Sequence, residues 1–287
     1  MRLASYMHNG AEGCGVVVGQ TILPLGAHGM IDFLRGGDVN LVRARQIASD
    51  PVPADALELS DVTLLAPFPR PLRNVFCVGR NYKLHIEEGA RARGVPVKMP
   101  PVPEFFSKQT NAVIGPDSDV LLPGITEKLD YEVELAIVIG RRGKDISREQ
   151  ARDHILGYTI VNDVTARDLQ QAHGQWFKGK SLDTSCPMGP WIVTADEYDQ
   201  APDHRIWLKV NGELRQDSLV SDMLFDCFDI VSHLSQGMTL EVGDVIATGT
   251  PSGVGLGLDP QIWLKDGDVM EAGIDGIGSI SNTVRAA

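Results

Sequence analysis

The feature that most constrains this chain is an apolar run with two glutamates, DYEVELAIVIG, at residues 130–140. Its density of Val, Ile and Tyr and its end at a glycine predict a buried strand. Side chains alternate along a strand, so Glu132 and Glu134 point to one face, roughly 7 Å apart, while Tyr131 and Val133 point to the other. Burying two like charges side by side costs several kcal/mol unless a cation offsets them. The alternative is a strand edge that faces solvent and carries two ordinary glutamates.

A second β-rich run, LGYTIVND at residues 156–163, ends in a third carboxylate, Asp163. Delivered from a neighbouring strand, this group would complete a cluster of oxygen ligands. Hard divalent ions prefer such ligands, whereas zinc favours His or Cys, and neither lies at a useful spacing here. We therefore predict a Mg²⁺ or Mn²⁺ site at Glu132, Glu134 and Asp163, with Ca²⁺ as a substitute in crystals.

Five motifs in a fixed order make the chain resemble the fumarylacetoacetate hydrolase superfamily. The motifs are GRNYKLHIEE at residues 79–88, DYEVELA at 130–136, VNDVTARDLQ at 161–170, KGKSLDTSCPMGPWIV at 178–193 and GDVIATGTPSGVG at 243–255. They span roughly residues 74 to 284. The resemblance implies a β-rich α+β fold whose catalytic domain is a mixed β-sheet roll or barrel. Members of this family catalyse several reactions, so the resemblance specifies the site better than the substrate.

A small β-rich domain is expected at residues 1–70, ahead of the catalytic domain at residues 71–287. Three short β-rich runs punctuated by Gly or Pro are followed by helical stretches at residues 30–34 and 41–48. The segment APFPRP at residues 66–71 is a stiff connector, because each proline fixes φ and disfavours helix. We place the domain boundary there. The first domain shows no catalytic pattern, and we expect it to support packing or dimerisation.

The composition argues against several classes of partner. A net charge of −12 disfavours nucleic acid, because phosphate binding needs clustered Lys and Arg. The N-terminus lacks the apolar core of a signal peptide, and no run approaches the roughly 18 apolar residues of a membrane helix. The cysteines are scattered without a CxxC pair, which favours buried free thiols in a reducing cytoplasm. They are Cys14, Cys77, Cys186 and Cys227. We therefore expect a cytoplasmic protein.

A candidate general base lies in KLHIEEGARARG, which predicts a short helix closed by Gly94. His85 and Glu88 are three residues apart and share a helix face, so the carboxylate can orient the imidazole and raise its basicity. The alternative is an exposed pair worth a few tenths of a kcal/mol. The resemblance implies the catalytic dyad, on a lid that orders over substrate. We also assign substrate binding to Arg80 and Tyr82, just before this helix.

Residues 140–155 predict a solvated turn and a surface helix, with Ser147 as its N-cap. Lys108 could face the site, but a solvated lysine is the default expectation. If Thr165 caps a helix that runs to Ala172, Asp163 and Gln170 lie two turns apart on one face. A surface glutamine is the alternative. The resemblance implies a functional Gln170, which would position water or a substrate oxygen.

Residues 174–181, GQWFKGKS, satisfy the P-loop pattern but lack its context. A P-loop follows a strand and opens a helix, whereas this match follows a helical stretch, contains Trp176 and Phe177, and soon reaches Pro187. Nucleotide binding is therefore not expected. The resemblance instead implies that Lys180, rather than its neighbour Lys178, is the active-site lysine that stabilises negative charge on an enolate or carboxylate oxygen.

The C-terminal third is predicted to be β-rich. Residues 206–215 contain Asn211-Gly212 between two strand patterns, which predicts a hairpin with a type I′ turn. A helix is expected over residues 223–236, and the similar pieces LEVGDVIATG and LKDGDVMEAG predict turns that lead into strands. The loop TGTPSGVGLG lacks the GxGxxG spacing of dinucleotide sites. The resemblance implies that Thr250 and its neighbours hold the carboxylate of a 2-oxo acid; a plain glycine-rich turn is the alternative.

The favoured function is a metal-dependent hydrolase of acylpyruvate-type 2,4-dioxo acids, which would give pyruvate and a carboxylic acid. The metal would polarise the carbonyl and stabilise the enolate that forms as the C–C bond breaks, while His85 activates water. Without water, the same chemistry gives an isomerase or decarboxylase of 2-oxo or 2-hydroxymuconate-type diacids, as in 2-hydroxyhepta-2,4-diene-1,7-dioate isomerases or an oxaloacetate decarboxylase. Val78 stands where some relatives carry a fourth metal carboxylate. We expect a homodimer in aromatic or sugar catabolism; a non-catalytic binding protein is the remaining alternative.

Overall fold

The structure is a computed structural model that describes residues 1–198 and 204–287. Its strands are β1 (Arg2–His8), β2 (Ala11–Val18), β3 (Thr21–Pro24), β4 (Leu57–Glu58), β5 (Thr63–Leu64), β6 (Val75–Gly79), β7 (Glu104–Lys108), β8 (Val113–Ile114), β9 (Val120–Leu122), β10 (Leu129–Asp130), β11 (Val133–Ile139), β12 (Ile155–Asn162), β13 (Thr165–Ala166), β14 (Cys186–Thr194), β15 (Arg205–Val210), β16 (Glu213–Leu219), β17 (Val245–Ala247), β18 (Val269–Ile274) and β19 (Gly278–Ala286). The α-helices are α1 (Met30–Arg35), α2 (Gly37–Ser49), α3 (Lys83–Arg93), α4 (Arg167–Ala172), α5 (Phe177–Lys180) and α6 (Cys227–Ser235).

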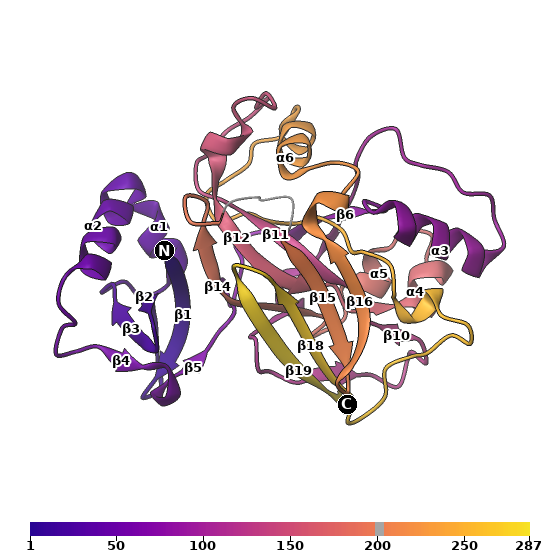
Figure 1. Ribbon diagram of the computed structural model, residues 1–287, viewed down its shortest axis with the longest axis horizontal. Helices are drawn as coiled ribbons and strands as arrows, with labels where there is room; N and C mark the ends of the chain where they lie inside the picture. The colour runs from indigo at the N-terminus through magenta and orange to yellow at the C-terminus, as the bar shows by residue number, and fades with distance from the viewer. Residues whose placement is uncertain (199–203) are drawn as a thin grey trace.

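Two sheets form the body of the protein. The larger, 12-stranded sheet follows the path β4-β3-β2-β1-β14-β12-β11-β17-β6-β7, with β5 paired to β1 and β8 to β14. The second sheet, β16-β15-β18-β19-β9, packs over β11 and β12 (Figure 1). Both sheets are mainly antiparallel, but β6–β17, β8–β14 and β9–β19 are parallel pairs. This mixed, strand-rich arrangement confirms the predicted β-rich α+β fold.

The central strand β11 is buried along its whole length. Leu135 and Ile137 face the core shared with the second sheet, whereas Ala136 and Val138 face the core beneath α1 and α2. Because both faces are covered, the strand beyond Glu134 must be apolar on both faces, which explains the hydrophobic run at residues 135–139. β12 pairs antiparallel with it, with Val133 opposite Asn162. This register sets the start of β11 beside the end of β12.

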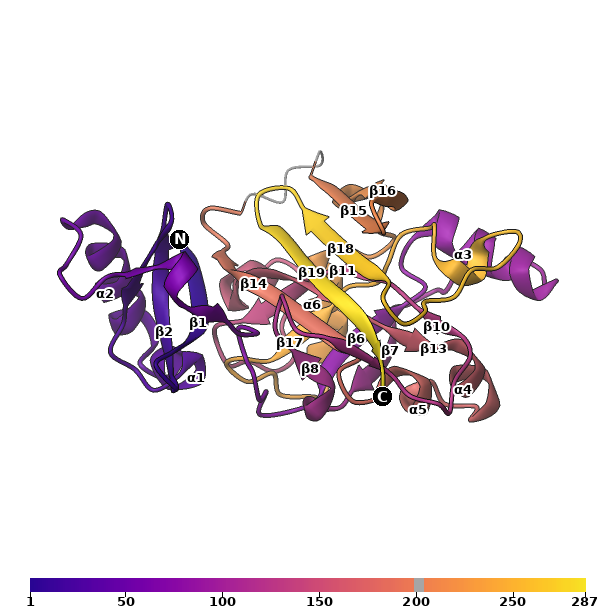
Figure 2. The same ribbon diagram turned by 90° about the horizontal axis from the view of Figure 1, so that it is seen from below.

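The N-terminal segment forms a lobe beside this body (Figures 1 and 2). β1, β2 and β3 correspond to the three predicted β-rich runs; they form an antiparallel meander, and α1 and α2 cover one side of it. The strands of the lobe belong to the larger sheet: β1 pairs with β14 of the body, with Arg2 opposite Val193. The sheet is therefore continuous across the proline-rich connector.

Two helix predictions outside the candidate site are wrong in their bounds. α6 begins at Cys227, not at residue 223, because the Asp226 side chain accepts hydrogen bonds from the backbone N–H groups of Phe228 and Asp229 and so caps the helix there. The predicted surface helix capped by Ser147 is only a 3₁₀ turn, η3 (Ala151–His154). Its segment is held against α6 by ion pairs of Arg148 with Asp226 and Asp229, so it follows the helix surface in turns.

The β15–β16 hairpin turns as predicted. Asn211 and Gly212 have φ values of 52° and 79°, the left-handed conformation that a type I′ turn requires. The four cysteines are buried and free, also as predicted. None of the described helices is long and apolar enough to cross a membrane.

Candidate active site

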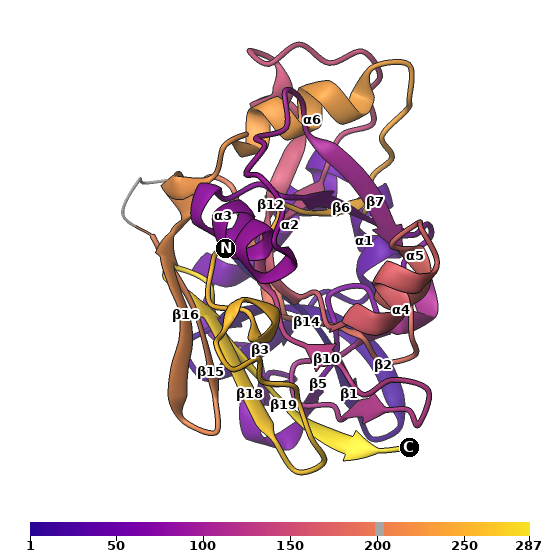
Figure 3. The same ribbon diagram turned by 90° about the vertical axis from the view of Figure 1, so that its right-hand side faces the viewer.

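The candidate site is a cavity of about 540 Å³ between α3, the helix that carries the predicted dyad, and the short helices α4 and α5. Figure 3 shows α3 on one side of this opening and α4 and α5 on the other. The start of β11 lies at its floor, and residues 250 and 256 of the glycine-rich loop line its wall. Val78, the position without a fourth carboxylate, also lines it. The site thus collects segments that are far apart in the sequence.

The three predicted metal ligands lie together. Ligand oxygens of Glu132, Glu134 and Asp163 all fall within 4.8 Å of one another, and the three residues are at most 3% exposed. Glu132 and Glu134 flank Val133 at the start of β11 and so share a face. Asp163 directly follows β12, and its N–H donates to the Glu132 carbonyl at 2.8 Å. The clustering is confirmed, and the alternative of a solvent-facing edge is wrong.

Two buried lysines lie against these carboxylates. Lys180 donates to Glu132 and, at 2.5 Å, to Asp163. Lys108 donates to the other oxygen of Asp163 at 2.6 Å and to the Val164 carbonyl at 3.0 Å. The expectation of a solvated Lys108 is therefore wrong: its side chain is fully buried, because β7 directs it beneath the cluster. Lys178, in contrast, is exposed, so the choice of Lys180 over Lys178 agrees with the geometry.

Arg167 is a third buried cation, and the sequence analysis missed it. It is the first residue of α4, and its guanidinium spans two carboxylates, at 2.8 Å from Asp130 and 2.7 Å from Glu132. Asp130 also accepts the backbone N–H groups of Gly255 and Leu256, at 2.7 and 3.1 Å. This network ties the start of β11 to α4 and to the glycine-rich loop.

The charges around each carboxylate set its proton affinity. Burial raises the pKa of Glu132, but the charges of Arg167 and Lys180 outweigh burial and hold it well below its usual range. Burial, together with the negative charges of Asp163 and Glu132, raises the pKa of Glu134 well above its usual range. Glu134 accepts only the Gly249 N–H, at 2.8 Å, among the hydrogen bonds of the described chain. It is therefore the carboxylate that most lacks a compensating cation.

The donor set fits a hard divalent cation. Three buried carboxylates converge, two of them line the cavity, and all the donor atoms are oxygens, as Mg²⁺ and Mn²⁺ require. In the described part of the chain, this is the one group of three His, Cys, Asp or Glu side chains close enough to share an ion. Glu132, Glu134 and Asp163 would hold the metal.

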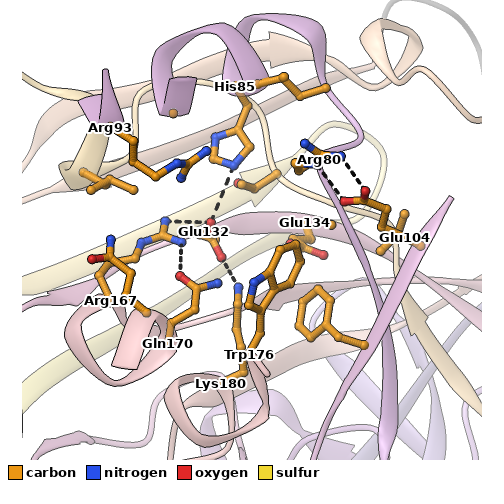
Figure 4. A pocket seen from close by; sticks show the side chains of 18 of the residues that line it. Arg80, His85, Arg93, Glu104, Glu132, Glu134, Arg167, Gln170, Trp176 and Lys180 are labelled. Atoms are coloured by element: carbon orange, nitrogen blue, oxygen red, sulfur yellow. Dashed lines mark hydrogen bonds and ion pairs between the residues drawn. The ribbon is translucent and has the colours of Figure 1, made fainter. Parts of the chain in front are cut away.

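The predicted dyad is formed and faces this cluster. His85 Nδ1 lies 2.9 Å from Glu88 Oε1, and His85 Nε2 lies 3.9 Å from Glu132 Oε1 (Figure 4). The second oxygen of Glu88 accepts the Gly253 N–H at 2.9 Å. Glu88 is 6% exposed, so the alternative of an exposed surface pair is wrong. Since Glu88 accepts at Nδ1, the lone pair of the neutral imidazole lies on Nε2, which points into the cavity.

Gln170 lines the cavity, but not for the predicted reason. Thr165 does not cap α4: it lies in β13, and its hydroxyl lies 3.0 Å from Glu132 Oε2 and 2.8 Å from the Asp163 carbonyl. The helix begins two residues later, at Arg167, whose Nη1 donates to Gln170 Oε1 at 3.3 Å. Gln170 is therefore placed by α4 and held by the arginine one turn before it.

The residues assigned to substrate binding differ in position. Arg80 and Thr250 line the cavity. Arg80 is paired with Glu104, and Thr250 donates to the Val133 carbonyl at 2.9 Å and accepts from Gln216 at 2.7 Å. Tyr82 is buried and is not among the residues that line the cavity. Its position gives no support to substrate binding by its side chain.

An aromatic wall was also missed. Phe106 and Trp176 line the cavity with ring centroids 5.3 Å apart, and the Lys180 ammonium lies 4.9 Å from the Phe106 ring centroid. Trp176 packs closely on Gly79: a Cβ at that glycine would lie 2.3 Å from the indole ring. Trp176, one of the bulky residues that argue against a P-loop, thus forms part of the wall of this cavity.

Comparison with known proteins shows which family this chain is similar to. The family described as fumarylacetoacetate (FAA) hydrolase C-terminal matches residues 74–285. The curated oxaloacetate tautomerase YisK of Bacillus subtilis is 46% identical over 264 residues, which cover 89% of this chain and 86% of the relative. Fumarylacetoacetate hydrolase (EaFAH) from psychrophilic Exiguobacterium antarcticum has a solved structure that is 42% identical, with a TM-score of 0.84 and full coverage of both chains.

A further solved structure, 2-hydroxyhepta-2,4-diene-1,7-dioate isomerase from Mycobacterium marinum, is 36% identical, with a TM-score of 0.79, and covers 100% of this chain and 98% of that one. The family match covers most of the chain, including every predicted metal ligand and the dyad. The relatives carry different activities in their names, as the several reactions of the superfamily lead one to expect. The chain belongs to the fumarylacetoacetate hydrolase family.

Proposed function

We propose that this protein is a divalent-metal-dependent tautomerase that interconverts the keto and enol forms of a 2-oxo diacid of the oxaloacetate type. The observation that carries the proposal is the position of His85 Nε2, which faces the carboxylate cluster while Glu88 fixes the imidazole from behind. The name of the Bacillus subtilis relative supports this isomerase alternative over the acylpyruvate hydrolase favoured from the sequence.

Tautomerisation moves one proton from C3 of the diacid to the oxygen on C2: the C3–H bond breaks, its electron pair forms the C2=C3 double bond, and the C2=O double bond becomes a single bond to the oxygen. His85 Nε2 takes the C3 proton, and Glu88 stabilises the imidazolium that results. A bound Mg²⁺ or Mn²⁺ would polarise the 2-oxo group and so acidify C3–H. Lys180, buried beside the carboxylates, adds positive charge on the side where the oxygen becomes negative. Return of the proton to that oxygen gives the enol.

C–C bond hydrolysis is the second candidate, and the position of Gln170 is the observation that favours it. Gln170 lines the cavity, and Arg167 holds its carbonyl oxygen, so the amide nitrogen is left to bind water or substrate oxygen. The solved structure from Exiguobacterium antarcticum also carries a hydrolase name. Hydrolysis needs a water next to His85, whereas tautomerisation needs C3–H there.

The test follows the loss of enol-oxaloacetate by its ultraviolet absorbance, with Mg²⁺ or Mn²⁺ and with chelator. We expect wild-type protein to accelerate the decay in a metal-dependent manner. His85→Gln is expected to lose roughly 10²- to 10⁴-fold in kcat, because it removes the base, with the affinity for Mn²⁺ changed little. The same metal concentration with the His85→Gln variant is the control for catalysis by free metal.

Acetylpyruvate distinguishes the two candidates. Pyruvate release from acetylpyruvate, with no acceleration of enol-oxaloacetate decay, would establish the hydrolase and reject the tautomerase. Loss of activity in His85→Gln together with loss of Mn²⁺ binding would show that His85 supports the metal site and would remove its assignment as the base.

A further inference from the structure

Three arginines line the cavity, and two of them already have carboxylate partners. Arg80 donates to Glu104 through Nε at 2.6 Å and through Nη2. Arg167 donates to Asp130 and Glu132. The third is Arg93, the last residue of the lid helix α3. Within residues 1–198 and 204–287, no carboxylate lies within ion-pair distance of its guanidinium.

The Arg93 side chain is directed into the site although it lies at the rim of the cavity. Figure 4 shows it extending toward His85 and Arg167. It folds back over Gly89, one turn earlier on α3: a Cβ at that glycine would lie 3.1 Å from Arg93 Nη2. The absence of a side chain at residue 89 therefore leaves room for the guanidinium on the cavity side of the helix.

The surroundings of Arg93 favour an anion. Although Arg93 is exposed, desolvation by the surrounding chain and the neighbouring charges of Arg167 and Arg80 lower its pKa. A guanidinium stays charged even so, and a carboxylate between these arginines would relieve their mutual repulsion. The planar fork of arginine also matches the two oxygens of a carboxylate. This position at the rim is thus a receptor for a negative group rather than for the apolar tail of a substrate.

We infer that Arg93 is a specificity-determining residue that binds the distal carboxylate of the 2-oxo diacid. The inference rests on the proposed function, in which the 1-carboxylate and 2-oxo group lie at the carboxylate cluster and C3 lies at His85. In a four-carbon diacid the distal carboxylate is bonded to C3, so it lies next to His85. Arg93 lies on the same helix as His85 and faces the same cavity.

This assignment also explains how a diacid would hold α3 over the cavity better than a monoacid does. His85 near the start of α3 and Arg93 at its end both meet the ligand, so a diacid holds the helix at two places. α3 ends directly after Arg93, at Gly94 with φ of 64°, which lets the chain leave the helix sharply. A monoacid would meet only the His85 end and would leave the Arg93 end free.

The alternative is that Arg93 is an ordinary solvated arginine. Arg91 provides a matched control for this alternative. It lies on the same helical turn, is exposed as Arg93 is, and donates to the Gly257 carbonyl at 3.4 Å, but unlike Arg93 it does not line the cavity. Loss of Arg91 removes the same charge from α3 without removing a group that faces the ligand.

The experiment measures exchange of C3 protons with deuterium by NMR for two substrates of equal chain length, oxaloacetate and 2-oxobutanoate. The proteins are the Mn²⁺- or Mg²⁺-loaded wild type, Arg93→Ala, Arg93→Lys and Arg91→Ala. Oxalate, which has no distal carboxylate, reports on the metal end by calorimetry. We expect Arg93→Ala to lose about 10- to 100-fold in kcat/KM for oxaloacetate, mainly through KM, since one charge-assisted pair is removed.

For 2-oxobutanoate exchange and oxalate affinity, we expect Arg93→Ala to change less than about 3-fold. Arg93→Lys should recover part of the loss with oxaloacetate, because it keeps the charge but not the fork. Arg91→Ala should behave as wild type. Equal losses for oxaloacetate and 2-oxobutanoate, or no loss for either, would overturn the inference.

Failure of the proposed function has a different outcome. Wild-type protein would then not exchange the C3 protons of oxaloacetate above the background of free metal. The role of Arg93 would be decided by calorimetry alone, through the affinity of wild type and Arg93→Ala for oxaloacetate relative to oxalate. A selective loss of oxaloacetate affinity in Arg93→Ala would support the carboxylate receptor, and unchanged affinity would reject it.

Discussion

Replacing Lys108 with methionine tests whether the cations beneath the carboxylate cluster hold it together. The Lys108 ammonium contacts Asp163 at 2.6 Å and the Val164 carbonyl at 3.0 Å, and both charged side chains are fully buried. Removing one partner of a buried ion pair costs about 3–5 kcal/mol, because the other charge stays buried. Methionine has nearly the same length as lysine, so little of the loss comes from a cavity. Lys180 still donates to Asp163, which argues for the lower half of this range.

The assay is urea denaturation in the presence of chelator, with thermal melting as a second measure. At about 2–4 °C per kcal/mol for a protein of this size, a loss of about 3–4 kcal/mol in Lys108→Met should lower Tm by roughly 6–16 °C. Lys178→Met is the control: this lysine is exposed, and its replacement should change stability by less than about 0.5 kcal/mol. A loss of stability below about 1 kcal/mol for Lys108→Met would refute the claim that the buried pair is needed to hold Asp163 in the cluster.

Added Mn²⁺ provides the second half of the same test. Asp130, Glu132, Glu134 and Asp163 face three cations, Lys108, Lys180 and Arg167. Without Lys108, a divalent ion would offset more uncompensated negative charge and should bind more tightly. A tenfold gain in affinity adds about 1.4 kcal/mol to the stabilisation by saturating Mn²⁺. Equal or smaller stabilisation of Lys108→Met than of wild type would show that Lys108 mainly orients Asp163 for the metal.

Two further predictions follow from the same geometry. Glu134→Gln should weaken Mn²⁺ binding, measured by calorimetry, at least about 100-fold. The Tm of the metal-free protein should stay unchanged or rise, because burial already raises the pKa of this carboxyl and an amide avoids a buried charge. A large drop in the metal-free Tm would contradict this reasoning. Gly257→Ala should lower kcat by roughly 10-fold or more, because the new Cβ would lie 2.3 Å from Glu88 Oε2 and would turn the carboxylate away from His85. Gly124→Ala, where no atom lies within 4 Å of the new Cβ, is the control, and equal activity of the two variants would count against the role of Glu88.

Local sequence patterns correctly predicted which side chains lie together when both belong to the same strand or helix. The alternation of a strand placed Glu132 and Glu134 on one face, and the spacing of a helix placed His85 beside Glu88. Both relations are set within a few residues, so packing elsewhere does not change them. The start of α6 was missed because Asp226 was not recognised as its N-cap, although Asp226 and Asp229 have the spacing of a capping box.

Contacts made across the fold were harder to predict. Lys108 meets Asp163 over 55 residues of sequence, and Arg167 meets Glu132 over 35. Neither partner can be read from a helical or strand period, because the pairs join different elements. Lys108 follows two phenylalanines on β7, a context that fits a solvated edge as well as a buried one. Only the packing of β7 and α5 around the cluster decides between these environments.

The charge balance of the predicted carboxylate cluster nevertheless indicates that further buried cations are needed beside Lys180. Once Glu132, Glu134 and Asp163 are assigned to a buried cluster, one lysine cannot balance them, and each uncompensated charge in a protein interior costs several kcal/mol. A divalent ion offsets two charges, but the chain must also fold before it binds the ion, so further cations have to come from the protein itself. Lys and Arg residues that adjoin apolar runs or the ligand motifs are the candidates, and Lys108 and Arg167 both meet this condition. A charge balance applied to the predicted cluster thus calls for further buried cations and includes Lys108 and Arg167 among the candidates, and the packing of the fold then selects these two.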